Sequence, residues 1–83
     1  MNIEQLRKQL IESEIPFSWY CLTGGLPSET SCIAQDSDGK WITYYSERGS
    51  RTGLKYFETE EEACDSFYRD LIHELDIYRK YRK

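Results

Sequence analysis

The feature that most constrains the fold is an amphipathic run at the C-terminal end of the chain. Thr59 and Glu62 have the spacing of a capping box, which marks the start of a helix. The glutamates after Thr59 and the basic residues within 79–83 match the charges that the helix dipole favours at its two ends. A helix with one apolar stripe must bury that stripe against a second layer of structure. The stripe consists of Ala63, Cys64, Phe67, Leu71 and Leu75, widened by Tyr68 and Ile72.

A shorter helix is predicted at the N-terminal end. Asn2 is its expected N-cap, and Gln5 lies three residues later, as a capping box requires. Pro16 ends the helical region, because the residue before a proline is pushed out of helical geometry. The apolar stripe of this helix is Ile3, Leu6, Leu10 and Ile11.

Four short runs rich in aromatic and β-branched residues lie between the two helices, at 17–22, 30–35, 40–47 and 54–58. Each is too short for a helix and is bounded by Gly, Pro, Asp or Ser residues, so we predict four strands. Short connections favour an antiparallel meander. The sequence therefore predicts a single α+β domain over residues 1–83, in the order α-β-β-β-β-α, with both helices on one face of the sheet.

The alternation of side chains predicts which residues share a face. Pairing Cys21 with Cys32 across a first hairpin gathers Phe17, Trp19, Cys21, Cys32 and Ala34 on one face, and the next turn adds Trp41 and Tyr45. The opposite face of the sheet then carries Tyr20, Ile33, Ile42 and Tyr44. If both helices pack on the other face, these four residues form an uncovered apolar surface suited to protein contact. If one helix covers each face, these four residues belong to the core instead.

Composition narrows the possible partners. The net charge is −4 and the pI is about 4.9, which disfavours a general nucleic-acid binder, because such a protein needs surplus Lys and Arg to displace counterions. Three cysteines without a CxxC pair indicate reduced thiols rather than a disulfide framework or a zinc site. The first residues lack the apolar segment of a signal peptide, and no run is long enough to span a membrane. We expect a cytoplasmic protein.

No motif points to catalysis. His73 is the only histidine, and no nucleophile is tied to it by sequence, so we interpret it as a surface helical residue. The cysteines are assigned to the buried side, where a thiol acts as a small apolar group. The acidic run after Thr59 lacks the alternating ligands and central glycine of a calcium loop, and "DSDG" lacks the downstream glutamate. We therefore predict neither enzymatic activity nor a metal or cofactor.

The stretch "RGSRTG" at 48–53 combines glycines, hydroxyls and two arginines. Such a composition can cradle an anion, but this one lacks the phosphate-loop pattern and leads into a strand rather than a helix. We predict a six-residue hairpin loop. Arg48 and Arg51, in an acidic protein, are nevertheless candidate contacts for another molecule.

Part of the chain resembles a family of small bacterial immunity proteins from polymorphic toxin systems, the immunity protein fifty-nine type. The resemblance covers the third strand to the middle of the second helix, and it implies a cytoplasmic antidote that binds a cognate toxin. It rests on Trp41, Tyr45, Glu47, Arg48, Gly49, Phe57, Glu60, Ala63, Cys64 and Phe67.

The leading functional hypothesis is therefore a non-enzymatic immunity protein. Its acidic block, formed by Glu58, Glu60, Glu61, Glu62 and Asp65, could face a basic nuclease cleft. A nucleic-acid-binding α+β module is the alternative, suggested by the element order and the basic end of the chain. A small enzyme using His73 is a third possibility. The candidate partner contacts are Tyr20, Tyr44, Glu47, Arg48, Arg51, Glu58, Glu60, Glu61, Glu62 and Asp65.

Overall fold

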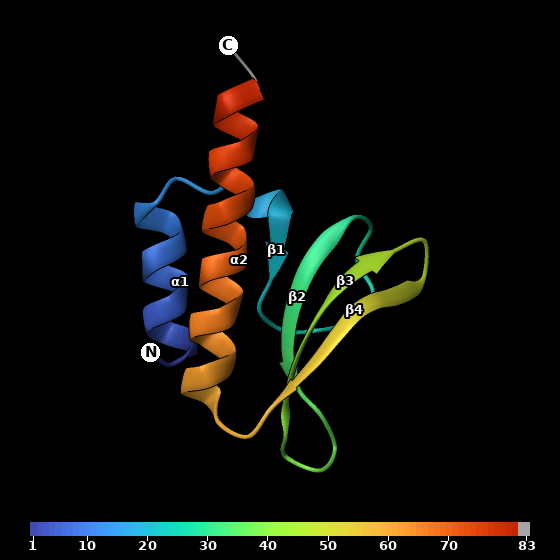
Figure 1. The fold of residues 1–83 in the computed structure, drawn as a ribbon. Helices are drawn as coiled ribbons and strands as arrows, with labels where there is room; N and C mark the ends of the chain where they lie inside the picture. Colours follow the sequence, from blue (N-terminus) through green and yellow to red (C-terminus); the bar gives the residue numbers. More distant parts are fainter. Residues whose placement is uncertain (82–83) are drawn as a thin grey trace.

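The computed structural model describes residues 1–81 and shows two helices and a four-stranded sheet (Figure 1). The predicted α+β class and the order of elements are confirmed. Arg82 and Lys83, predicted at the basic end of the last helix, lie outside the described residues. The elements are α1 (Ile3–Glu12), a short 3₁₀ helix (Phe17–Trp19), β1 (Tyr20–Cys21), β2 (Thr30–Gln35), β3 (Trp41–Glu47), β4 (Ser50–Phe57) and α2 (Glu60–Tyr81).

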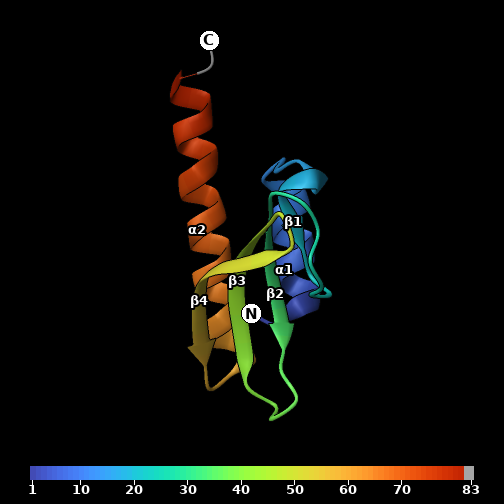
Figure 2. The ribbon, with the colours of Figure 1, turned by 90° about the vertical axis from the view of Figure 1, so that its right-hand side faces the viewer.

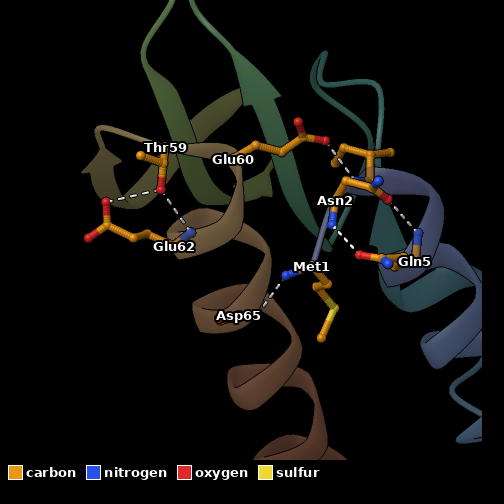
Figure 3. Close-up of polar contacts among 8 residues, drawn as sticks. Met1, Asn2, Gln5, Thr59, Glu60, Glu62 and Asp65 are labelled. Atoms are coloured by element: carbon orange, nitrogen blue, oxygen red, sulfur yellow. Dashed lines mark hydrogen bonds and ion pairs between the residues drawn. The ribbon is translucent and has the colours of Figure 1, made fainter.

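Both helices begin at the predicted caps. The Asn2 side chain accepts a hydrogen bond from the Gln5 backbone N–H at 2.9 Å, and the Gln5 side chain accepts one from the Asn2 N–H at 2.9 Å. At the start of α2, the Thr59 hydroxyl accepts from the Glu62 N–H at 3.2 Å and donates to the Glu62 carboxylate at 3.1 Å (Figure 3). These bonds satisfy backbone donors that a helix start leaves without partners.

Both helices lie on one face of the sheet, as predicted. Figure 2 views the sheet with α2 behind β3 and β4 and with α1 behind β1 and β2. The main core lies between these layers and is closed by Ile33 from β2. Its buried residues are Leu6, Leu10, Ile15, Ile33, Ala63, Cys64, Phe67, Leu71 and Leu75.

The sheet has the order β1-β2-β3-β4, and its first pair corrects the predicted meander. Cys21 does pair with Cys32, but β1 runs parallel to β2. Residues 17–19 form a 3₁₀ turn after Pro16 instead of a strand, so only two residues remain for β1. The loop 22–29 then returns across the sheet before β2 begins, which a hairpin turn would not do.

The second face of the sheet is covered by that returning loop. The Tyr44 hydroxyl donates a hydrogen bond to the Gly25 carbonyl at 2.7 Å, and the Cys21 thiol donates to the Gly24 carbonyl at 3.2 Å. A small second core of Cys32, Ile42 and Tyr44 lies beneath.

The predicted distribution of residues between the faces was wrong. Ala34 pairs with Ile42, whereas Trp41 pairs with Gln35, so the predicted uncovered surface does not exist. Ile33 instead joins the helix-side core, and Tyr20 packs against that core.

Candidate functional site

A groove with a volume of about 380 Å³ lies between α2 and the β3–β4 hairpin. A β-bulge between Thr43 and Tyr45 disturbs the pairing with β4, where Gly53 has a φ of +63°. Bulges bend and twist a strand pair, and the far end of the hairpin curves away from α2 (Figure 1). The groove lies beside this irregularity in the strand pair. It is lined by Ser31, Thr43, Tyr44, Tyr45, Thr52, Gly53, Lys55, Phe67, Asp70, Leu71, His73 and Glu74.

The strand side of the groove carries a row of hydroxyl groups. Ser31, Thr43 and Tyr45 point to the helix side of the sheet, as their register with β2 and β4 requires. Thr52 faces Tyr45 and donates a hydrogen bond to its carbonyl at 3.3 Å. Thr43 is only 6% exposed, and its hydroxyl makes no hydrogen bond with any residue in the described range 1–81. This hydroxyl is not fully enclosed, because the side-chain oxygens that are buried without a partner in this range are those of Tyr20 and Ser46. The strand side therefore offers a hydroxyl group that lines the groove and has no hydrogen-bond partner within the described residues.

The helix side of the groove combines apolar and charged groups. Phe67 and Leu71 are buried at its base, while Asp70, His73 and Glu74 line its rim. The Lys55 ammonium on β4 donates to the Asp70 carboxylate at 3.1 Å and so bridges the two sides.

Glu74 is the unusual group on this rim. Partial burial raises the pKa of the Glu74 carboxyl, the nearby charge of Asp70 raises it further, and His73 opposes both. Within the described part of the chain, the Glu74 side chain has no ion-pair or hydrogen-bond partner. Glu74 is exposed, and a carboxyl group whose pKa is raised by a neighbouring carboxylate is more frequent in functional sites than elsewhere.

Other carboxylates add negative charge near the rim of the groove. Burial raises the pKa of the Tyr45 hydroxyl, and so do the negative charges of Glu29, Glu47 and Glu74. Three carboxylates from three parts of the chain therefore act on the hydroxyl of one half-exposed tyrosine. The groove and its rim present hydrogen-bond acceptors and negative charge, which suits a cationic ligand.

Four members of the predicted acidic block have partners within the protein, and Figure 3 shows three of them, Glu60, Glu62 and Asp65. The Glu60 carboxylate accepts a hydrogen bond from the Ile3 N–H at 2.8 Å and so ties α2 to the start of α1. Asp65 lies 3.4 Å from the Met1 ammonium, and Glu62 takes part in the cap with Thr59. These three carboxylates stabilise helix starts and the contact between the helices.

The other predicted contacts are dispersed. Glu58 lies 3.9 Å from the Lys40 ammonium, and Glu61 is exposed on the first turn of α2. Glu47 is exposed at the end of β3 beside Arg48. Arg48 and Gly49 form a tight two-residue turn with positive φ, so the predicted six-residue loop was too long.

Neither predicted tyrosine is an exposed contact. Tyr44 is 3% exposed, and the Arg51 guanidinium stacks over its ring at 4.7 Å from the ring centre, on the face opposite to the helices. Tyr20 is half-buried beside the helix-side core. The exposed tyrosine next to the acidic side chains is Tyr45 instead. The sequence could have indicated it through the alternation with Thr43, but only with the correct register.

The groove lining places His73 with the carboxylates of Asp70 and Glu74 and includes no cysteine. In residues 1–81 no three His, Cys, Asp or Glu side chains are placed to hold a metal ion. None of the described helices has the length and apolar character needed to cross a membrane. Comparison with protein-family models, with curated proteins and with solved structures finds no match.

The three cysteines are expected to react at very different rates. Burial, followed by the charge of Glu60, raises the pKa of the Cys64 thiol to about 11, so it stays protonated. Burial also opposes ionisation of Cys21, but hydrogen bonds with Thr23 and Gly24 outweigh it and lower the pKa. We expect iodoacetamide at pH 8 to label Cys21 first in the folded protein, as read by peptide mass spectrometry. Equal labelling of Cys64 without denaturant would contradict the buried assignment.

Proposed function

We propose that the chain is a non-enzymatic, cytoplasmic immunity protein that neutralises a cognate bacterial toxin by binding it. The observation that supports this proposal most is the electronegative groove, which gathers hydroxyl acceptors and one carboxylate, that of Glu74, which has no partner among the described residues. An antidote needs a complementary surface rather than a catalytic group. The residues that resemble the immunity family include Tyr45 on the rim and Phe67 at the base of the groove.

The groove side of the molecule is a better contact surface than the start of α2. The carboxylates of Glu60, Glu62 and Asp65 have partners within the chain, whereas Glu74 does not. Glu47 and Tyr45 extend the same acidic area along β3. A nuclease that grips phosphates has a basic cleft, and an acidic surface both attracts such a cleft and excludes its nucleic acid.

Co-expression tests this function. We expect the wild-type chain to protect cells that express the toxin domain encoded by the neighbouring gene. Glu47→Lys combined with Glu74→Lys should weaken binding at least tenfold and abolish protection, because charge complementarity becomes repulsion. Glu12→Lys makes the same kind of charge change on exposed α1 and should protect like the wild type.

Growth with each variant and the affinity of the purified pair, measured by calorimetry, are the two readouts. Cells that die despite soluble wild-type protein would contradict the proposed function. Protection by the doubly substituted protein would place the contact elsewhere on the surface.

A further inference from the structure

We propose that the groove between α2 and the β3–β4 hairpin is a receptor for one arginine side chain of the partner. This inference rests on the proposed function and names the chemistry that the groove recognises. Among the residues that line the groove, only Tyr44 belongs to the contacts predicted from the sequence. His73 was interpreted as a surface residue, and Thr43, Asp70 and Glu74 were not singled out.

The polar groups of the groove match a guanidinium. A guanidinium carries five N–H donors and no acceptor. The groove offers the unpaired carboxylate of Glu74 and the unpartnered hydroxyl of Thr43, a residue that is 6% exposed. It also offers the hydroxyl of Ser31, which lies on the same face as Tyr45. A phosphate or carboxylate ligand would instead meet like charge at Glu74.

The shape and the apolar base also favour arginine over lysine. Phe67 and Leu71, which are 3% and 1% exposed, form an apolar wall along which an alkyl stem can lie. A planar guanidinium can reach separated acceptors on the floor and on the rim at once, whereas an ammonium is a compact point charge. Lys55 already neutralises Asp70 at 3.1 Å, which leaves Glu74 as the charge that an incoming cation would pair with.

A titration of the full chain with N-acetyl-arginine-N-methylamide tests the site directly. Two-dimensional ¹H–¹⁵N NMR should show saturable shifts centred on Thr43, Tyr45 and His73. The citrulline analogue has nearly the same shape without the charge, and it should bind at least tenfold more weakly. Saturable shifts equal for the two probes, or no saturable shifts at these residues with the arginine probe, would overturn the inference.

Two variants locate the binding within the groove. Glu74→Gln should weaken binding of the arginine probe about tenfold or more, and Thr43→Val should weaken it several-fold. Asp76→Asn removes a carboxylate from the same helix outside the groove and should leave the affinity unchanged. An unchanged affinity for Glu74→Gln would also overturn the inference.

The unfolding temperature of Glu74→Gln shows whether the substitution disturbs the fold. A carboxyl whose folded pKa is raised favours folding most at pH below its unfolded pKa, and this contribution is lost as pH rises through the folded value. Near pH 7 the charged side chain therefore disfavours folding, so Glu74→Gln should unfold at the same temperature as the wild type or at a higher one. Its loss of binding would then come from the site.

Different experimental results would contradict the receptor proposal and the immunity proposal. If the arginine probe does not bind while the wild-type chain still protects cells, the receptor assignment is wrong and the immunity proposal stands. If the probe binds the groove but the chain gives no protection, the immunity proposal is wrong.

Discussion

Replacement of Leu71 by alanine is expected to destabilise the fold by about 2–5 kcal/mol, the range for deleting a fully buried leucine side chain. Leu71 is 1% exposed and lies in the core between the helices and the sheet. A small domain has a total stability of roughly 5–15 kcal/mol, so this loss would leave little margin. Urea denaturation followed by circular dichroism measures the change.

Ile77→Ala is the matched control for Leu71→Ala. Ile77 lies on the same helix but is 45% exposed, so its loss should cost less than about 1 kcal/mol. Similar midpoints for the two variants would mean that α2 does not bury the Leu71 face against the sheet.

Gly24→Val is expected to cost about 2–4 kcal/mol, from two causes that add. Gly24 has a φ of +82°, which a β-branched residue rarely adopts, and an added Cβ would lie 3.0 Å from the Cβ of Ala34. The Tyr44 hydroxyl would lie 3.7 Å away on the same side. Thermal and urea unfolding of the purified variant measure the cost.

Gly25→Val separates the two causes. Gly25 has a φ of +88°, but an added Cβ would meet nothing within 4 Å. This variant should lose only the backbone contribution, and Gly24→Val should be less stable by a further 1 kcal/mol or more, an amount typical of overpacking. Equal stabilities would contradict the packing of loop 22–29 on the second face of the sheet.

The helices could be predicted because their signals are local. A cap at Asn2 or Thr59 and an apolar stripe at helical spacing are both complete within a few turns of sequence. A turn at Arg48 could also be predicted from local residues, but the predicted six-residue loop at 48–53 is a two-residue turn in the structure. The direction of β1 depended instead on where loop 22–29 leads the chain, which no local pattern records. An aromatic run at 17–19 looked like a strand but folded as a 3₁₀ turn after Pro16.

The candidate site was harder to predict, because it draws on elements far apart in the sequence. Thr43 and Glu74 come together only if the register of β3 and the position of α2 are both known. The predicted acidic block was chosen from its density of charge. Much of that charge serves to cap α2 and to tie it to α1, as Glu60 does with the Ile3 N–H.

We propose that a partner binds at the groove between α2 and the β3–β4 hairpin. The most direct test is an NMR comparison of the ¹⁵N-labelled chain alone and mixed with the proposed toxin partner. We predict that the largest shifts occur at Thr43, Tyr45, Gly53 and His73. Large shifts confined to loop 22–29 or to the first turn of α2 would contradict the claim.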